Sequence, residues 1–187
     1  MMGSNDFCVD LCYVDYRRAP ERHRQNLIKT LEFIQRNLPR TLVQIVTSPN
    51  LGMILNQFKG TKPICHLTHS AECPCLFGLA YKNRQLEFLN IMKQWQQVEM
   101  QVANDPRFQK KDDFAVVAQT FTLNLTFPVL TTKNGKLLTD FTYLSEDCFH
   151  FSQKGYSRAA NALWNNMLEP VGQKTIDWRK EFTQFLC

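Results

Sequence analysis

The apolar residues in the first part of the chain predict a helix followed by a strand. Pro20 and Glu21 suit the first turn of a helix, and Pro39 ends it. Between them, apolar residues recur at helical spacing: Leu27, Leu31, Ile34 and Leu38. The next segment, 42–47, is short, β-branched and bounded by prolines, so we expect a strand there.

The middle of the chain predicts a second helix and a second strand. A long helix is expected over about 79–103, before the break at Asn104-Asp105-Pro106. One apolar stripe runs along this helix, and packing in the core explains it better than a cofactor site: Tyr81, Phe88, Met92, Trp95 and Val102. The segment 114–118 is nearly all apolar, which is typical of a strand covered on both faces in a parallel sheet.

The last third of the chain completes the pattern. Residues 123–127 alternate between apolar and polar, and Asn134-Gly135 predicts a turn. Ser152 is the expected N-cap of a last helix, which Pro170 ends. The expected buried face of this helix is formed by Ala159, Ala160, Leu163, Trp164 and Met167. The order helix, strand, helix, strand, helix predicts an α/β domain with a parallel sheet, of which only two or three strands are recognisable.

Composition excludes several classes of protein. With 187 residues and 44% hydrophobic residues, the chain has the make-up of one ordinary globular domain. The net charge of +5 is mild, and the one basic group suits a solvated helix face better than a nucleic-acid patch: Arg17, Arg18, Arg22 and Arg24. Nucleic acid is therefore not an expected partner. No run of 18 apolar residues is present, so no membrane-spanning segment is expected.

Other features indicate a secreted parent. Seven cysteines are many for a cytosolic chain of this length, and Asn124-Leu125-Thr126 is a glycosylation sequon. The N-terminus has neither the charged nor the apolar region of a signal peptide. A secretory composition without a leader predicts a chain cut from a longer precursor or made from an internal start.

The segment 60–76 is rich in cysteine and is expected to be an irregular loop. It places five possible zinc ligands within eleven residues: Cys65, His66, His69, Cys73 and Cys75. Their spacing fits no zinc module, so we favour a disulfide-stapled loop over a metal site. The odd number of cysteines leaves Cys187 as the natural unpaired one.

Two short motifs carry candidate chemistry. An aspartate three residues before a histidine, as in Asp147 and His150, can accept the ring N–H and fix the tautomer of the imidazole. In Gly3-Ser4-Asn5-Asp6, Gly3 leaves its backbone accessible and the amide of Asn5 can donate to an oxyanion. Taken alone, each motif is weak evidence, because turns use the same residues.

Together and in this order, the two motifs resemble the later blocks of the GDSL or SGNH hydrolases: G-x-N-D, and D-x-x-H followed by a serine-bearing helix start. The surrounding residues look like the phospholipase B branch of that family: 3–8, the pair Cys8 and Cys12, 147–152 and 162–172. The resemblance covers about 3–175, with 176–187 left as a tail. It implies a flavodoxin-like three-layer α/β/α fold with a parallel sheet that lacks its first strands.

The resemblance also implies roles for four residues. His150 would be the general base, Asp147 its orienting acid, and Asn5 an oxyanion donor in a loop that Gly3 supports. In the family, the nucleophilic serine lies in a G-D-S block upstream, and this chain begins after that block. No other serine stands in a strand-to-helix elbow: Ser4, Ser48, Ser70 and Ser145.

The implied function is hydrolysis of acyl esters in phospholipids, lysophospholipids and other membrane and dietary lipids, without metal or organic cofactor. The family acts outside the cell or at the apical membrane surface. Because losing a triad nucleophile costs on the order of 10⁶ in rate, we expect the isolated chain to be nearly inactive. The alternative is a catalytically inactive truncated isoform or fragment that acts as a binding module or has no independent function. A zinc-stabilised interaction module ranks third.

Overall fold

The fold comes from a computed structural model that describes residues 4–13, 15–178 and 186. Helices and strands follow one another as α1 (Ala19–Asn37), β1 (Thr41–Val46), α2 (Gly52–Asn56), α3 (Pro63–Glu72), α4 (Pro74–Phe77), α5 (Gln85–Ala103), β2 (Phe114–Gln119), β3 (Val129–Thr131), β4 (Leu137–Thr139) and α6 (Gln153–Leu168). Short π and 3₁₀ turns lie between several of these elements.

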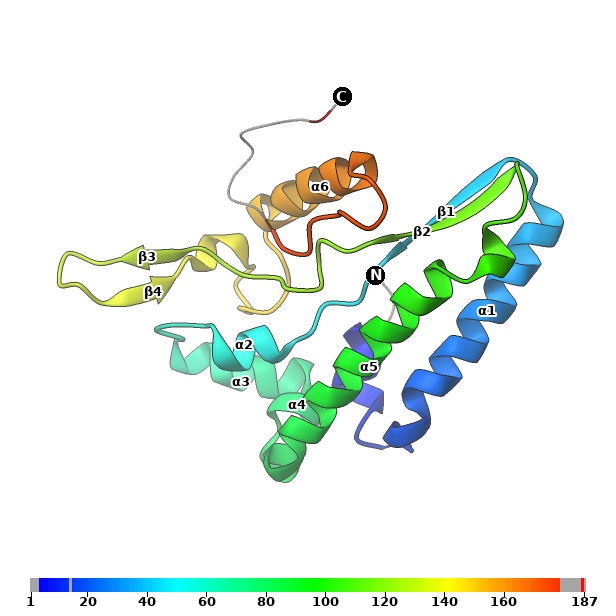
Figure 1. The fold of residues 1–187 in the computed structure, drawn as a ribbon. Coiled ribbons are helices and arrows are strands. Elements are labelled where there is room, and N and C mark those ends of the chain that lie inside the picture. Colours follow the sequence, from blue (N-terminus) through cyan, green and yellow to red (C-terminus); the bar gives the residue numbers. More distant parts are fainter. Residues whose placement is uncertain (1–3, 14, 179–185, 187) are drawn as a thin grey trace.

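The two predicted strands form a parallel pair, which confirms the α/β prediction. β1 and β2 align from Thr41 opposite Phe114 to Val46 opposite Gln119. The connection between them contains α5, as a parallel pair requires. Figure 1 shows α1 and α5 side by side on one side of the pair and α6 on the other. The layers are therefore helix, sheet and helix, as in a partial SGNH fold.

The first helix follows the sequence pattern closely. Pro20 lies in the first turn of α1 and is buried, and the helix ends before Leu38, which is extended. Leu31 is fully buried and packs with Val98 and Val116, which joins α1, α5 and β2 in one core.

The long helix begins later than predicted. Residues Leu79–Arg84 form a 3₁₀ turn after an extended Gly78, and α5 begins only at Gln85. The predicted stripe along α5 lies in the core, where Phe88 and Met92 are fully buried.

The prediction of an irregular loop over 60–76 is wrong. Lys62 is extended, and Pro63 then supplies the fixed φ angle of a first helical turn, so α3 begins there. Pro74 cannot donate a helical hydrogen bond, and the chain restarts as α4. The predicted disulfides are present, but their partners lie outside the segment: Cys8–Cys73, Cys12–Cys75 and Cys65–Cys148. Cys187 lies outside the described residues.

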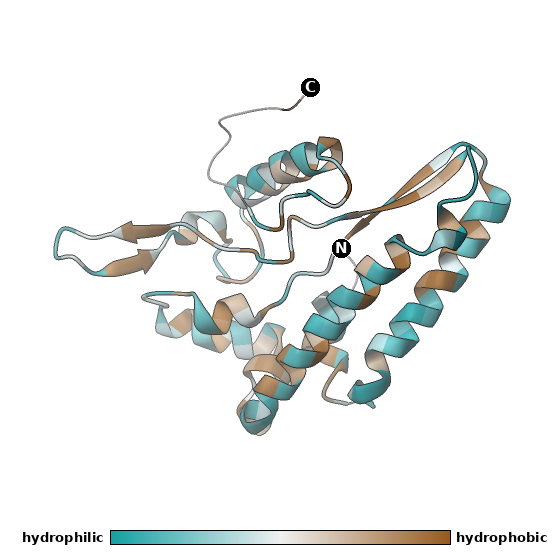
Figure 2. Ribbon diagram, in the orientation of Figure 1, coloured by the Kyte–Doolittle hydropathy of each residue, from teal (hydrophilic) through white to brown (hydrophobic). Residues whose placement is uncertain are grey.

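No strand forms over the alternating segment 123–127. A turn ends at residue 124, and the irregular stretch that follows buries Leu125 and Phe127. The expected turn at Asn134-Gly135 forms and closes the hairpin β3–β4, which projects from the body and whose two strands are largely hydrophobic (Figures 1 and 2).

The last helix starts as predicted, but its buried face is only partly right. Ser152 Oγ accepts a hydrogen bond from the backbone N–H of Gly155 at 3.2 Å and caps α6. Ala159 and Leu163 are half-buried, whereas three other residues of the predicted face are exposed: Ala160, Trp164 and Met167. Among the described elements, α6 packs mainly on β2 and on the short turn 141–143, and these two elements cover only part of its length.

Throughout the described ranges, every helix is too short or too polar to cross a membrane.

Candidate active site

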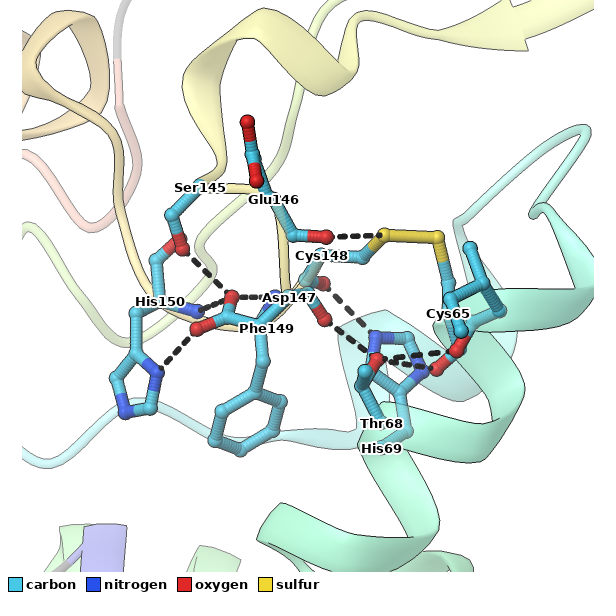
Figure 3. Close-up of a disulfide and its surroundings, with 10 residues drawn as sticks. Cys65, Thr68, His69, Ser145, Glu146, Asp147, Cys148, Phe149 and His150 are labelled. Atoms are coloured by element: carbon cyan, nitrogen blue, oxygen red, sulfur yellow. Dashed lines mark hydrogen bonds and ion pairs between the residues drawn. A yellow bond between two sulfur atoms is a disulfide. The ribbon is translucent and has the colours of Figure 1, made fainter.

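The structure brings Asp147 and His150 into direct contact in the loop before α6. His150 Nδ1 lies 2.9 Å from Asp147 Oδ2 (Figure 3). The loop is closed at its base by an antiparallel bridge between Leu144 and Phe151. Within it, the backbone N–H of Ser145 donates to the carbonyl of His150 at 2.8 Å. The three-residue spacing thus forms a tight turn that folds the imidazole back onto the carboxylate.

The carboxylate of Asp147 is held ionised. Partial burial alone would raise its pKa, but several hydrogen bonds outweigh that effect and hold the pKa well below its usual range. Asp147 Oδ1 accepts from Ser145 Oγ at 2.6 Å and from the backbone N–H groups of Phe149 and His150 at 2.8 and 2.9 Å.

This ionisation fixes the direction of the bond to His150. Since a carboxylate can only accept, the proton of the pair lies on His150 Nδ1. In the neutral ring, the lone pair then lies on Nε2, and the His150 side chain is 54% exposed. The arrangement presents a basic nitrogen to solvent, as a general base requires.

The loop lies against α3 through three contacts (Figure 3). Cys148 is bonded to Cys65. Thr68 Oγ1 donates to the carbonyl of Asp147 at 2.6 Å, and His69 Nε2 lies 2.8 Å from the carbonyl of Cys148. Cys148 has a φ of +59°, in the left-handed region that non-glycine residues seldom adopt.

His69 is a buried histidine in an aromatic environment. It is 2% exposed, and burial lowers its pKa despite the bond to Cys148. Phe77 and Phe149 lie with ring centroids 5.1 and 5.9 Å from it. Sequence analysis considered His69 only as a zinc ligand, and nothing in its sequence context indicated this contact.

The segment α3–α4 also holds the N-terminal block. Cys8 and Cys12, which follow the G-S-N-D motif, are bonded to Cys73 and Cys75. One cysteine-rich segment is therefore covalently joined to both candidate motifs.

The structure shows no hydrogen bond between Asn5 and His150, and the oxyanion role stays a prediction. Gly3 lies outside the described residues. Asn5 is exposed and helical, and among the described residues its side chain has no hydrogen bond. Two aspartates that follow Asn5 in the chain, Asp6 and Asp10, line a cavity of about 400 Å³. His23 and Trp95 also line this cavity.

None of the candidate serines within the described ranges donates to His150 Nε2. Ser145 Oγ donates to Asp147, and Ser70 Oγ lies 2.9 Å from the carbonyl of His66. Ser48 is fully buried, and its hydroxyl lies 2.8 Å from Glu99 Oε1. Ser4 is half-buried at the start of the first turn.

The pairing of Ser48 with Glu99 is a buried cluster that sequence analysis missed. The carboxylate also accepts from the backbone N–H of Ser48 and from Trp95 Nε1, and His23 Nε2 lies 3.4 Å away. A catalytic triad needs the histidine between serine and acid, whereas here the carboxylate is in the middle. The cluster instead anchors the chain after β1 to α5.

The described residues give no support to the hypothesis of a zinc site in the segment 60–76. Among them, no three His, Cys, Asp or Glu side chains gather around a common point. Cys65, Cys73 and Cys75 are all in disulfides and offer no thiolate. Asn124 is exposed after β2, and its glycosylation stays a prediction.

Comparison with known proteins gives consistent results. The sequence model of the family described as GDSL-like lipase/acylhydrolase matches residues 1–163. "Phospholipase B1, membrane-associated" of Homo sapiens is 35% identical over 176 residues, which cover 93% of this chain and 12% of that protein. The Mus musculus protein of the same name is 33% identical over 177 residues, covering 94% of this chain and 12% of that protein. No solved structure gives a significant match.

Proposed function

Because the chain belongs to the GDSL-like lipase/acylhydrolase family, we propose that it serves in the hydrolysis of acyl esters of phospholipids and lysophospholipids. The substrate class rests on the similarity to proteins named phospholipase B1. The observation that carries the proposal is the contact of Asp147 with His150, which leaves Nε2 of an exposed imidazole available.

In the proposed chemistry, His150 Nε2 removes the proton of a serine hydroxyl as the oxygen attacks the ester carbonyl. Asp147 keeps the imidazole in the required tautomer and stabilises the imidazolium. The same nitrogen then protonates the leaving alcohol, and water hydrolyses the acyl-enzyme in a second round. Asn5, with Gly3 in its loop, is the proposed donor to the oxyanion. No step requires a metal or an organic cofactor.

The disulfides and the relatives' printed name also support a place of action. Three disulfides persist only in an oxidising compartment, and the relatives are named membrane-associated. We therefore place the proposed reaction outside the cell, at a membrane surface.

A second candidate is a non-catalytic role, in binding lipid or a partner protein. One observation favours it: within the described ranges, no serine hydroxyl is hydrogen-bonded to His150 Nε2. In this case the Asp147–His150 pair would be retained without a nucleophile.

One experiment separates the two candidates. Hydrolysis of lysophosphatidylcholine and of a short-chain ester is measured for the wild type, His150→Ala and His66→Ala, where His66 is an exposed histidine on α3 that serves as matched control. Turnover that is lost in His150→Ala and kept in His66→Ala supports the hydrolase, and labelling with a fluorophosphonate then locates the serine. Equal turnover in all three proteins contradicts the role of His150. No turnover in the wild type favours the non-catalytic role.

A further inference from the structure

We propose that α3 positions the acid–base pair, with His69 and Thr68 as positioning residues that act through the backbone of the loop 145–150. The inference rests on the proposed function, and it goes beyond it by assigning roles to residues outside both motifs.

The contacts of the loop divide into two sets. Bonds inside the loop hold Asp147 against His150, but they do not fix how the pair is oriented on the protein. The contacts with α3 come from Cys65, Thr68 and His69, which are spaced so that they share one face of that helix. Two consecutive carbonyls of the loop, those of 147 and 148, accept from this face.

A single peptide group connects the two sets. The carbonyl of Cys148 accepts from His69, and the N–H of the same peptide, on Phe149, donates to Asp147 Oδ1. A peptide whose carbonyl accepts a hydrogen bond is polarised and becomes a stronger N–H donor. His69 therefore strengthens a bond that fixes the position of the carboxylate facing His150, although it touches neither residue of the pair by hydrogen bond.

The chemical state of His69 suits this role. A backbone carbonyl can only accept, so the proton lies on His69 Nε2. The lowered pKa, caused by burial, keeps the ring neutral in this tautomer. The ring of Phe149 also lies between the two histidines, with centroids 5.9 Å from His69 and 5.2 Å from His150. A displacement of His69 is thus passed on through packing as well.

Thr68 supplies the second anchor. Its hydroxyl donates to the carbonyl of Asp147 at 2.6 Å, directly on the residue that pairs with His150. The covalent bond from Cys65 to Cys148 holds the loop close to α3, and the two hydrogen bonds set its rotation.

The test reads the tautomer of His150 in the folded chain by ¹⁵N–¹H correlation spectra of the imidazoles. His69→Phe keeps an aromatic ring and removes the donor, while His69→Gln keeps a donor and serves as the rescue. Thr68→Val keeps the shape and removes the hydroxyl, with Thr68→Ser as its matched control. If His69→Phe does not fold, the Thr68 pair carries the test alone.

The expected result is a fall of at least about twofold in the ratio of the Nδ1–H to the Nε2–H form of His150 in His69→Phe and in Thr68→Val. The value of one ordinary hydrogen bond, about tenfold, is the upper limit because the effect is passed on through the loop. The ratio recovers in His69→Gln and Thr68→Ser. In an Asp147→Asn background, neither His69→Phe nor Thr68→Val changes the ratio further, because their effect passes through the carboxylate.

An unchanged ratio in well-folded His69→Phe and Thr68→Val overturns the proposal, as does an equal change in the Asp147→Asn background. The readout needs no turnover, so a chain that hydrolyses no ester can still support or refute it. Failure of this inference and failure of the proposed function are therefore distinguishable.

Discussion

Removing the Cys65–Cys148 bond gives the most quantitative prediction about the candidate site. The bond joins residues 83 positions apart. In the loop-entropy description, opening a loop of that length destabilises the folded protein by about 4.5 kcal/mol. The bond Cys12–Cys75 is the matched control. Once Cys8 and Cys73 are joined, it closes a ring spanning only residues 8–12 and 73–75, so opening it costs about 2.5 kcal/mol.

The assay is urea unfolding of the wild type and of two double variants, Cys65→Ala with Cys148→Ala and Cys12→Ala with Cys75→Ala. The site variant should lose nearly twice the free energy of unfolding that the control loses. Its Tm should fall by about 9–18 °C, as expected for a chain of this size. Alanine avoids a buried hydroxyl at Cys65, which is 1% exposed.

A loss in the site variant no larger than in the control would refute the reasoning. It would mean that α3 and the loop 145–150 stay in contact in the unfolded chain without the disulfide. Alternatively, packing in the folded protein would hold them together without help from the disulfide. A second readout follows from the further inference: the tautomer of His150 should move in the site variant and stay unchanged in the control.

Three further predictions follow from single contacts. Because the folded protein lowers the pKa of Asp147, its ionised carboxylate stabilises the wild type relative to Asp147→Asn above the ordinary pKa of 3.8. This stabilisation is lost as pH falls below that value. In urea unfolding from pH 7 to pH 3, the difference in unfolding free energy between the two proteins should therefore narrow only below about pH 4. Ser152→Ala removes the N-cap of α6, whose hydroxyl accepts from the N–H of Gly155 and donates to the carbonyl of Thr142, and should cost about 1 kcal/mol by the same assay, with Ser152→Thr as the control that keeps the hydroxyl. Glu99→Leu removes the buried carboxylate that accepts from the hydroxyl and N–H of Ser48 and from Trp95 Nε1, and it should cost about 2–4 kcal/mol; a loss below about 1 kcal/mol would contradict the anchoring role of this cluster.

Local patterns were sufficient for much of the fold. Proline at a first turn, helical spacing and an all-apolar segment located α1 and both strands of the parallel pair. The segment 60–76 was missed because its cysteines and histidines read as a loop or a metal site. Their actual partners are 63 to 83 residues away, and no local pattern shows such partners. The burial of α6 was overestimated for a related reason. Periodicity identifies the apolar side of a helix but does not show whether another element packs on it.

The candidate site was predictable to the same extent. The spacing of Asp147 and His150 was enough to expect their contact, because a turn of three residues is a local feature. The contribution of Thr68 and His69 depends on a helix packing against that turn from 79 positions away. The role of Asn5 as an oxyanion donor stays a proposal from family resemblance, since its side chain is exposed and makes no hydrogen bond among the described residues.

The central claim is that Asp147 fixes His150 as a base with its lone pair on Nε2. The most direct measurement is the ¹⁵N–¹H correlation spectrum of the imidazole of His150 in the wild type and in Asp147→Asn, at a pH where the ring is neutral. We expect mainly the Nδ1–H form in the wild type and a shift toward Nε2–H in the variant. A wild type that is mainly Nε2–H, or a ratio that Asp147→Asn leaves unchanged, would contradict it.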